Sequence, residues 1–148
     1  MTESHGRLIR PKFVTRAMLP AQPAVLFAFG DNMQRRGFGD QAREMRGEPN
    51  AVGIPTKWAP HAGPAAFFRD TDSERQDVRQ AIADAFDQLD AAIRSGCAVA
   101  IPADGLGTGR AGLPTRAPRI ANYISERITA IEAAAQRNVL CSRQGGMP

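Results

Sequence analysis

The stretch Ile101-Pro-Ala-Asp-Gly-Leu-Gly-Thr-Gly-Arg-Ala-Gly-Leu113 is the strongest signal in this sequence. It lies between an apolar run, Cys97 to Ile101, and a predicted helix that begins near Thr115. Its glycines, at positions 105, 107, 109 and 112, allow positive φ angles and leave peptide N–H groups uncovered, so the loop can surround an anion such as a nucleotide phosphate. No Gly-Lys-Ser/Thr follows and no G-x-G-x-x-G opens the helix, so two common nucleotide-binding patterns are excluded. A plain turn is the alternative interpretation.

Five short segments on either side of this loop in the sequence are predicted as strands. Three of them are continuous and apolar, as inner strands are: Val25 to Phe29, Asn50 to Ile54 and Cys97 to Ile101. Pro55 is expected to break the second. The other two are Phe13 to Leu19, predicted as an edge strand, and Asn138 to Cys141, predicted as a final strand.

Helices are predicted between these strands. Ser73 and Gln76 match a capping box, and apolar residues then recur at spacings of four and three, which predicts a helix over about 74–94. Isoleucines at 120, 124, 128 and 131 line one face of a last long helix. Asp40 to Arg46 is predicted as a short helix, and Trp58 to Asp72 as a long ordered loop. The alternation of strands and helices predicts an α/β fold.

Length and composition are those of one globular domain. A chain of 148 residues can bury roughly two thirds of its unfolded surface, and we expect a core over about residues 13–141 with frayed termini. No apolar segment approaches the about 18 residues that a membrane span needs, and Met1 to Gly6 is polar, so no membrane partner is predicted and the expected location is cytoplasmic. Cys97 and Cys141 fit reduced thiols.

The net charge of +4 favours anionic partners without choosing between nucleotides and nucleic acid. The basic residues are spread along the chain, which is also the pattern of an ordinary solvated surface. His5 and His61 are too few and too far apart to indicate a metal site, so neither a metal nor a cofactor is predicted. The oligomeric state stays open.

Three polar or glycine-rich segments follow the predicted inner strands. They are Gly30 to Gly39, Pro55 to Trp58 and Pro102 to Gly112. Ligands of α/β folds bind where strands end at their carboxyl edges, so the three segments together predict one binding site.

These segments resemble the loops of a macro domain, the fold family that binds ADP-ribose. Asp31-Asn-Met-Gln-Arg-Arg-Gly-Phe-Gly-Asp-Gln-Ala42 is similar to the first loop, and Ile101 to Gly109 with Leu113 to the diphosphate-binding loop. Gly53-Ile-Pro-Thr-Lys57 is similar to the strand of one branch, which includes the terminal ADP-ribose glycohydrolase and the antitoxin that removes ADP-ribose from DNA. The resemblance implies a single three-layer domain with a mixed central sheet flanked by helices. The chain is also similar to a poorly characterised family of small phage and bacterial proteins, which brings no known activity.

The resemblance assigns the chemistry to Lys57, because the lysine of that branch is catalytic. Burial beside Trp58 could depress the pKa of its amine and leave a nucleophile for C1 of the distal ribose, whereas the plainer alternative is a surface lysine after a turn. The second loop lacks the acidic residue that the branch carries just after its G-x-G, and Asp31 and Asp104 are the candidates to replace it.

The resemblance also assigns the ligand contacts. Asn32 would orient ribose hydroxyls, or it forms a turn with Asp31. Arg110 would close over the phosphates, or it is a solvated arginine, while Trp58 and Phe38 would stack on the ligand or simply pack. The other predicted contacts are Gly37, Gly39, Gln41, Thr56, Gly105, Leu106, Gly107, Thr108 and Gly109.

Three functions remain open from the sequence. The first is a domain that binds ADP-ribose or a related nucleotide and hydrolyses an ADP-ribosyl linkage on protein, nucleic acid or a small molecule. The second is a binding module that uses the same pocket without turnover. The third is a nucleic-acid-associated accessory protein, which the basic pI near 9.8 favours.

Overall fold

A four-stranded parallel sheet forms the centre of the computed structural model, which describes residues 6–145 and the side chains of residues 6–136. The strands stand in the order β1-β4-β2-β3. They are β1 (Leu8–Ile9), β2 (Val25–Asn32), β3 (Ala51–Lys57) and β4 (Ala98–Ala100). The α/β class is confirmed, and the expectation of a mixed sheet is wrong, because every strand pairing among the described residues is parallel.

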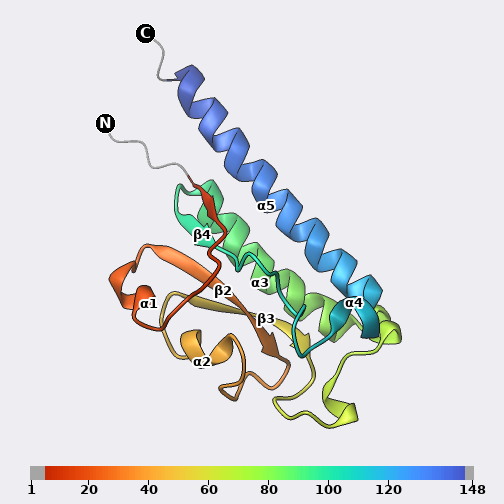
Figure 1. The fold of residues 1–148 in the computed structure, drawn as a ribbon. Coiled ribbons are helices and arrows are strands. Elements are labelled where there is room, and N and C mark those ends of the chain that lie inside the picture. Colours follow the sequence, from red (N-terminus) through yellow and green to blue (C-terminus); the bar gives the residue numbers. More distant parts are fainter. Residues whose placement is uncertain (1–5, 146–148) are drawn as a thin grey trace.

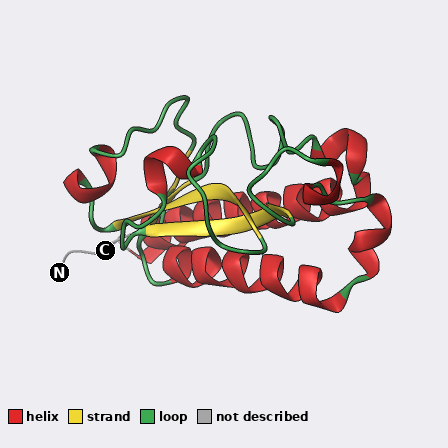
Figure 2. Ribbon diagram, turned by 90° about the horizontal axis from the view of Figure 1, so that it is seen from below, coloured by secondary structure: helices red, strands yellow, loops and turns green. Residues whose placement is uncertain are grey.

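Helices cover both faces of this sheet, so the fold has three layers (Figure 2). The two long helices, α3 (Gln76–Arg94) and α5 (Pro118–Gly145), pack on one face, and the short α1 (Met18–Ala21) and α2 (Ala42–Met45) pack on the other (Figure 1). Between β3 and α3 lie two 3₁₀ turns, η1 (Pro64–Ala66) and η2 (Asp70–Glu74), and α4 (Leu113–Arg116) precedes α5. No helix of the described residues is long and apolar enough to cross a membrane.

Strand β2 is apolar on both sides because it lies inside the sheet with helices on either face. Phe27 and Phe29 pack with Leu19 and Met45 on the side of α1 and α2, whereas Ala28 belongs to the core under α3 and α5. The predictions of strands at Val25 to Phe29 and Cys97 to Ile101 are therefore confirmed, since β2 and β4 are both inner strands.

The third predicted inner strand, Asn50 to Ile54, is instead the edge strand β3, and it continues through Pro55 to Lys57. Proline lacks an N–H group and is tolerated in a strand whose outer side has no partner. The register of β2 and β3 shifts between Asp31 and Asn32, so that Asn32 stands opposite Lys57. This irregularity brings two predicted site residues together.

Two other predicted strands are wrong. The segment Phe13 to Leu19 forms no strand, because Arg16 turns it away from the sheet by donating to the carbonyl oxygens of Arg43 (2.9 Å) and Arg46 (2.9 Å). The edge strand beside β4 is β1. Residues 138–141 lie within α5. The prediction of a strand failed because periodicity alone cannot distinguish a short apolar run in a strand from part of a helix.

The predicted helices α2, α3 and α5 are present with small shifts of their ends. Helix α3 begins at Gln76, and Ser73 lies in η2, so the predicted capping box does not form. The Asp72 carboxylate instead accepts a hydrogen bond from the Arg69 N–H (2.7 Å) at the start of η2. The long loop after Lys57 is ordered by η1 and by an antiparallel bridge between Lys57 and Phe67.

A substitution at Gly53 tests how tightly β2 and β3 fit. A Cβ atom at this position would overlap the buried Asp31 carboxylate. We expect Gly53→Ala to lower the free energy of unfolding by about 1–3 kcal/mol, measured by urea denaturation. The matched control is Gly109→Ala, where no atom lies within 4 Å of the added carbon, and its stability should stay within about 0.5 kcal/mol of the parent. Equal stability of the two variants would contradict this packing.

Candidate functional site

A cavity of about 480 Å³ opens where β2 and β3 end, and residues of all three predicted segments line it. The predicted site residues that line it are Asp31, Asn32, Gly37, Gly39, Gln41, Thr56, Lys57, Asp104, Gly107, Thr108, Gly109 and Arg110. Four predicted contacts do not line it, namely Gly105, Leu106, Trp58 and Phe38. Leu106 is buried in the core under α3 and α5, and Gly105 lies behind the cavity wall with its carbonyl oxygen bonded to Gln41.

Asp31 is the buried charge of this site, with only 5% of its surface exposed. Its carboxylate forms ion pairs with Arg46 and with Arg35 (3.2 Å), and it accepts a hydrogen bond from the Asn32 N–H (2.8 Å). Two guanidinium groups and one peptide N–H thus already occupy the oxygens of this carboxylate. Its observed interactions are those of a structural anchor.

Arg46 extends this anchor to the first loop, residues 33–41. Its Nε donates to the Gly37 carbonyl oxygen (2.6 Å) and its Nη2 to that of Arg36 (3.3 Å). Three residues of this loop have positive φ, namely Arg35, Gly37 and Asp40. Such a backbone is costly at Arg35 and Asp40, which are not glycines, and Arg46 holds the segment between them at Arg36 and Gly37.

Asn32 and Thr56 use their polar atoms within the protein. Asn32 donates from Nδ2 to the Arg36 carbonyl oxygen (2.8 Å) and accepts at Oδ1 from the Gln34 N–H (3.0 Å). The Thr56 hydroxyl donates to the Asp31 carbonyl oxygen (3.1 Å). Both residues line the cavity, but their polar side-chain atoms already hold the turn that shapes it.

The glycine loop, residues 102–112, presents unpaired peptide groups. Gly105 and Gly107 have φ angles of 94° and 75°, and the Thr108 hydroxyl donates back to the Asp104 carbonyl oxygen (2.6 Å). Within the part of the chain that the structure describes, no acceptor receives a hydrogen bond from the N–H groups of residues 107–111. Consecutive N–H groups in such a turn form a concave surface that suits an anion.

Gly39 in the first loop and Gly109 in the glycine loop both line the cavity, and the fold does not require glycine at either position. Neither has a φ angle in the left-handed region, and an added Cβ atom would meet nothing within 4 Å at either position. Open space beside both backbones is consistent with the close approach of a ligand.

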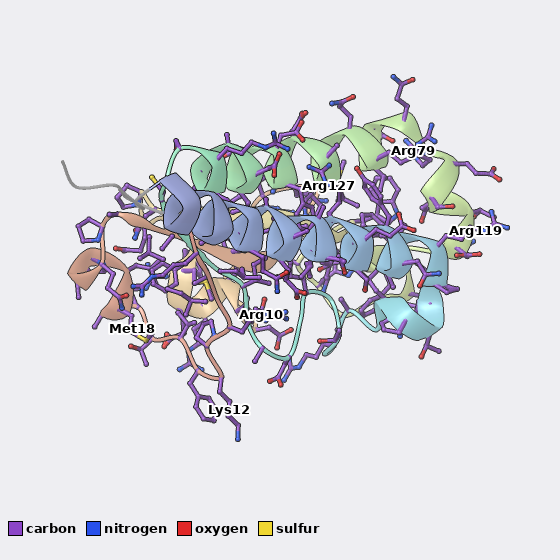
Figure 3. The ribbon with its side chains drawn as sticks, turned by 90° about the horizontal axis from the view of Figure 1, so that it is seen from above. Arg10, Lys12, Met18, Arg79, Arg119 and Arg127 are labelled. Carbon is purple, nitrogen blue, oxygen red and sulfur yellow. The ribbon has the colours of Figure 1, made fainter. Side chains whose placement is uncertain are left out.

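Arg10 fixes the base of the glycine loop. Its guanidinium donates to the carbonyl oxygens of Ile101 (3.0 Å) and Pro102 (3.0 Å), and pairs with Glu132 of α5 (3.3 Å). Figure 3 shows Arg10 beside α5, on the side where this loop lies. The start of the loop is thereby tied to the N-terminal segment and to α5.

Lys57 ends β3 at the cavity wall. Its Nζ donates to the His61 carbonyl oxygen (2.9 Å) and lies 5.0 Å from the centre of the Phe67 ring. Burial lowers the pKa of the Lys57 ammonium below its ordinary value, the Asp40 carboxylate opposes this shift, and the Arg110 guanidinium adds to it. The amine is thus more readily deprotonated than that of a solvated lysine.

Several cavity residues were missed by the sequence interpretation. They are Arg36, Asp40, Arg46, Pro60, His61 and Phe67. Asp40 pairs with Arg110 (3.6 Å) and so connects the first loop to the glycine loop across the cavity. Asp40 could have been predicted as a site residue because it directly follows Gly37-Phe-Gly39 in the sequence. Phe67 could not, because only its bridge to Lys57 brings it to the cavity.

Trp58 and Phe38 do not line the cavity. Trp58 packs edge to face on Phe68, with ring centres 5.2 Å apart, and donates to the Asp72 carboxylate (3.1 Å), so its contacts are those of packing. Phe38 is 63% exposed. Among the residues that the structure describes, no group of three or more His, Cys, Asp or Glu is placed to hold a metal ion.

Residues 9–127 match the model of a family of unknown function, DUF7831. The chain belongs to this family. No curated protein and no solved structure matches it. The matched region of this DUF7831 protein includes all three segments that surround the cavity.

The charges beside Lys57 allow its titration to be shifted in both directions. Asp40→Asn removes the negative charge that stabilises the ammonium, so the pKa of Lys57 should fall further, whereas Arg110→Met should raise it. The measurement is the pH dependence of the ¹³C resonance of reductively methylated lysine, and Lys12, the other lysine of the sequence, serves as the internal reference. Shifts of the same sign in both variants would refute this arrangement of charges.

Proposed function

We propose that this DUF7831 protein binds ADP-ribose or a related nucleotide in the cavity at the carboxyl ends of β2 and β3. The observation that carries the proposal is the row of unpaired N–H groups at residues 107–111. Most of these residues are exposed, so their N–H groups are open to an incoming ligand, and phosphate oxygens are strong acceptors for a concave row of such groups. The diphosphate would lie on this row.

The charges around the cavity support an anionic ligand. Asp31 is neutralised by its arginine partners, which leaves Lys57, Arg36 and Arg110 as the cationic groups on the wall. Asp40 and Asp104 oppose them, and Asp40 is itself paired with Arg110. A phosphate that displaced Asp40 from Arg110 would gain a guanidinium partner.

The size of the cavity fits a small molecule of nucleotide class. Its volume of about 480 Å³ falls in the range of about 300–1,000 Å³ that is usual for such sites. The choice of ADP-ribose among nucleotides rests on the resemblance of the three loops to those of macro domains and on Lys57 at the end of β3. The ADP-ribosyl group of a modified protein or nucleic acid would enter the same cavity.

Hydrolysis of an ADP-ribosyl linkage is the second candidate, and the lowered pKa of Lys57 favours it. In this reaction the neutral amine attacks C1 of the distal ribose, the bond from C1 to the carrier breaks, and the leaving group takes up a proton. Water then releases the sugar from the amine. Asp31 is buried and held by two arginines, whereas Asp40 is exposed, has one longer ion pair with Arg110 (3.6 Å) and acts electrostatically on Lys57. Asp40 is therefore the better placed of these two carboxylates for the proton transfers.

Binding is tested by calorimetric titration with ADP-ribose, with AMP and ribose 5-phosphate as controls. We expect saturable binding that needs the whole ligand. Gly39→Ala and Gly109→Ala should each weaken it by about tenfold, or 1.4 kcal/mol, because the added methyl group occupies space that the ligand uses. Their thermal unfolding should match that of the parent. The absence of heat with the parent at millimolar ADP-ribose, or full affinity in both variants, would exclude this binding mode.

Turnover is tested with ADP-ribosylated protein and oligonucleotide substrates, by mass spectrometry of the released ADP-ribose. We expect Lys57→Met to abolish release while the affinity for ADP-ribose changes less than tenfold, and Lys12→Met to act as the parent does. Full activity of Lys57→Met would exclude the nucleophile. Binding by the parent without any product would assign the chain as a binding module.

A further inference from the structure

Gln41 connects two walls of the cavity through a single side chain. Its Oε1 accepts a hydrogen bond from the Gly30 N–H (2.7 Å) near the end of β2, and its Nε2 donates to the Gly105 carbonyl oxygen (3.2 Å) in the glycine loop. Both polar atoms of the amide are therefore engaged within the protein, although the residue lines the cavity.

The sheet explains why this connection is needed. Strands β2 and β4 pair only from Val25 opposite Ala98 to Phe27 opposite Ala100, after which β4 ends and the chain leads into the glycine loop. The Phe27 N–H donates to Asn50 on the β3 side (2.8 Å), so that of Gly30, three residues later, faces the side that β4 has left. The Gln41 amide takes the place of the missing peptide group, with an acceptor toward β2 and a donor toward the loop.

The glycine loop also lies close against β2 at this point. A Cβ atom on Gly30 would stand 3.4 Å from Gln41 Oε1 and 3.6 Å from the Gly107 nitrogen. Gly105, which accepts from Gln41, holds a φ angle of 94°. Gln41 therefore holds a residue whose positive φ angle turns the chain just before residues 107–111, which line the cavity.

We infer that Gln41 is a positioning residue that holds the glycine loop in its anion-binding shape and makes that shape depend on the first loop. Gln41 itself makes no contact with the ligand. The inference rests on the proposed function for its effect on ligand affinity, but not for its effect on the loop.

The chemistry of the connection is specific. It needs one acceptor and one donor on the same planar group, which a carboxamide supplies and a protonated carboxylic acid supplies equally. An ionised carboxylate has no donor and would face the Gly105 carbonyl oxygen with a negative charge. A thioether supplies no amide-like donor at any pH.

The test compares Gln41→Glu and Gln41→Met with the parent, and with Gln34→Glu as a control that makes the same change elsewhere in the first loop. In the absence of ligand, amide hydrogen exchange is measured by NMR at Leu113, whose N–H closes the glycine loop on the Gly107 carbonyl oxygen (3.0 Å). Exchange at Leu113 should quicken at least tenfold in Gln41→Met and stay at the parent rate in Gln34→Glu.

Calorimetry with ADP-ribose then follows the consequence for binding. Gln41→Met should bind at least tenfold more weakly than the parent at every pH. Gln41→Glu should be equally weak at pH 7.5 and recover toward the parent as the pH is lowered to about 4.5, close to the ordinary pKa of glutamate. Each affinity is compared with that of the parent at the same pH.

The outcomes separate this inference from the proposed function. Unchanged exchange in Gln41→Met, or a binding defect of Gln41→Glu that acid does not relieve, would overturn the positioning role even if the parent binds ADP-ribose. Faster exchange in Gln41→Met, with no binding by the parent, would uphold the positioning of the loop and remove the proposed ligand. If Gln41→Met does not fold, the pH dependence of Gln41→Glu decides.

Discussion

The buried carboxylate of Asp31 is the constraint on which the site depends. An uncompensated charge in the interior would cost several kcal/mol, so Asp31 must keep its arginine partners in the folded protein. Arg46 meets this need and, with its remaining donors, fixes the Gly37 and Arg36 carbonyl oxygens. One ion pair thereby sets both the end of β2 and the path of the first loop.

The same constraint reaches the glycine loop through short links. The first loop ends at Gln41, whose amide holds Gly105, while Arg10 holds the start of the glycine loop from its other side. The loop is thus gripped at its base and near its first turn, and residues 107–111 extend beyond these points with their N–H groups unpaired. A binding surface made of main-chain groups keeps its geometry only if the chain on both sides of it is fixed.

The sequence was sufficient to predict what periodicity and glycine spacing determine. The inner strands β2 and β4, the long helices and the meeting of three loops all follow from local patterns of apolar and turn residues. The edge position of β3 did not follow, because Pro55 interrupts a strand by its own chemistry and only the missing neighbour makes it acceptable. The helical structure of residues 138–141 could not be predicted either, because a segment of four residues is too short for its hydrophobic period to distinguish a helix from a strand.

For the site residues, too, some properties could be predicted from the sequence and others could not. Loop membership could be predicted, so most of the named residues do line the cavity, but hydrogen-bond partners depend on the tertiary fold. Asn32, Gln41 and Thr56 have polar side chains typical of ligand contacts, yet the structure uses those atoms to hold the loops. Leu106 is buried in the core although it lies in this loop, and the glycines on either side of it both have positive φ angles that turn the backbone sharply.

The proposed binding and the proposed turnover place different demands on the groups that would carry them out. A surface of peptide N–H groups needs no particular protonation state, so the proposed binding of an anion requires no change of charge in the loop. A nucleophilic amine must first lose its proton and its bond to the His61 carbonyl oxygen. Burial and Arg110 favour the first step, while Asp40 opposes it for as long as it is ionised. A phosphate that drew Arg110 away from Lys57 would remove part of the drive toward the neutral amine, so the ligand that occupies the loop also influences the group that would attack it.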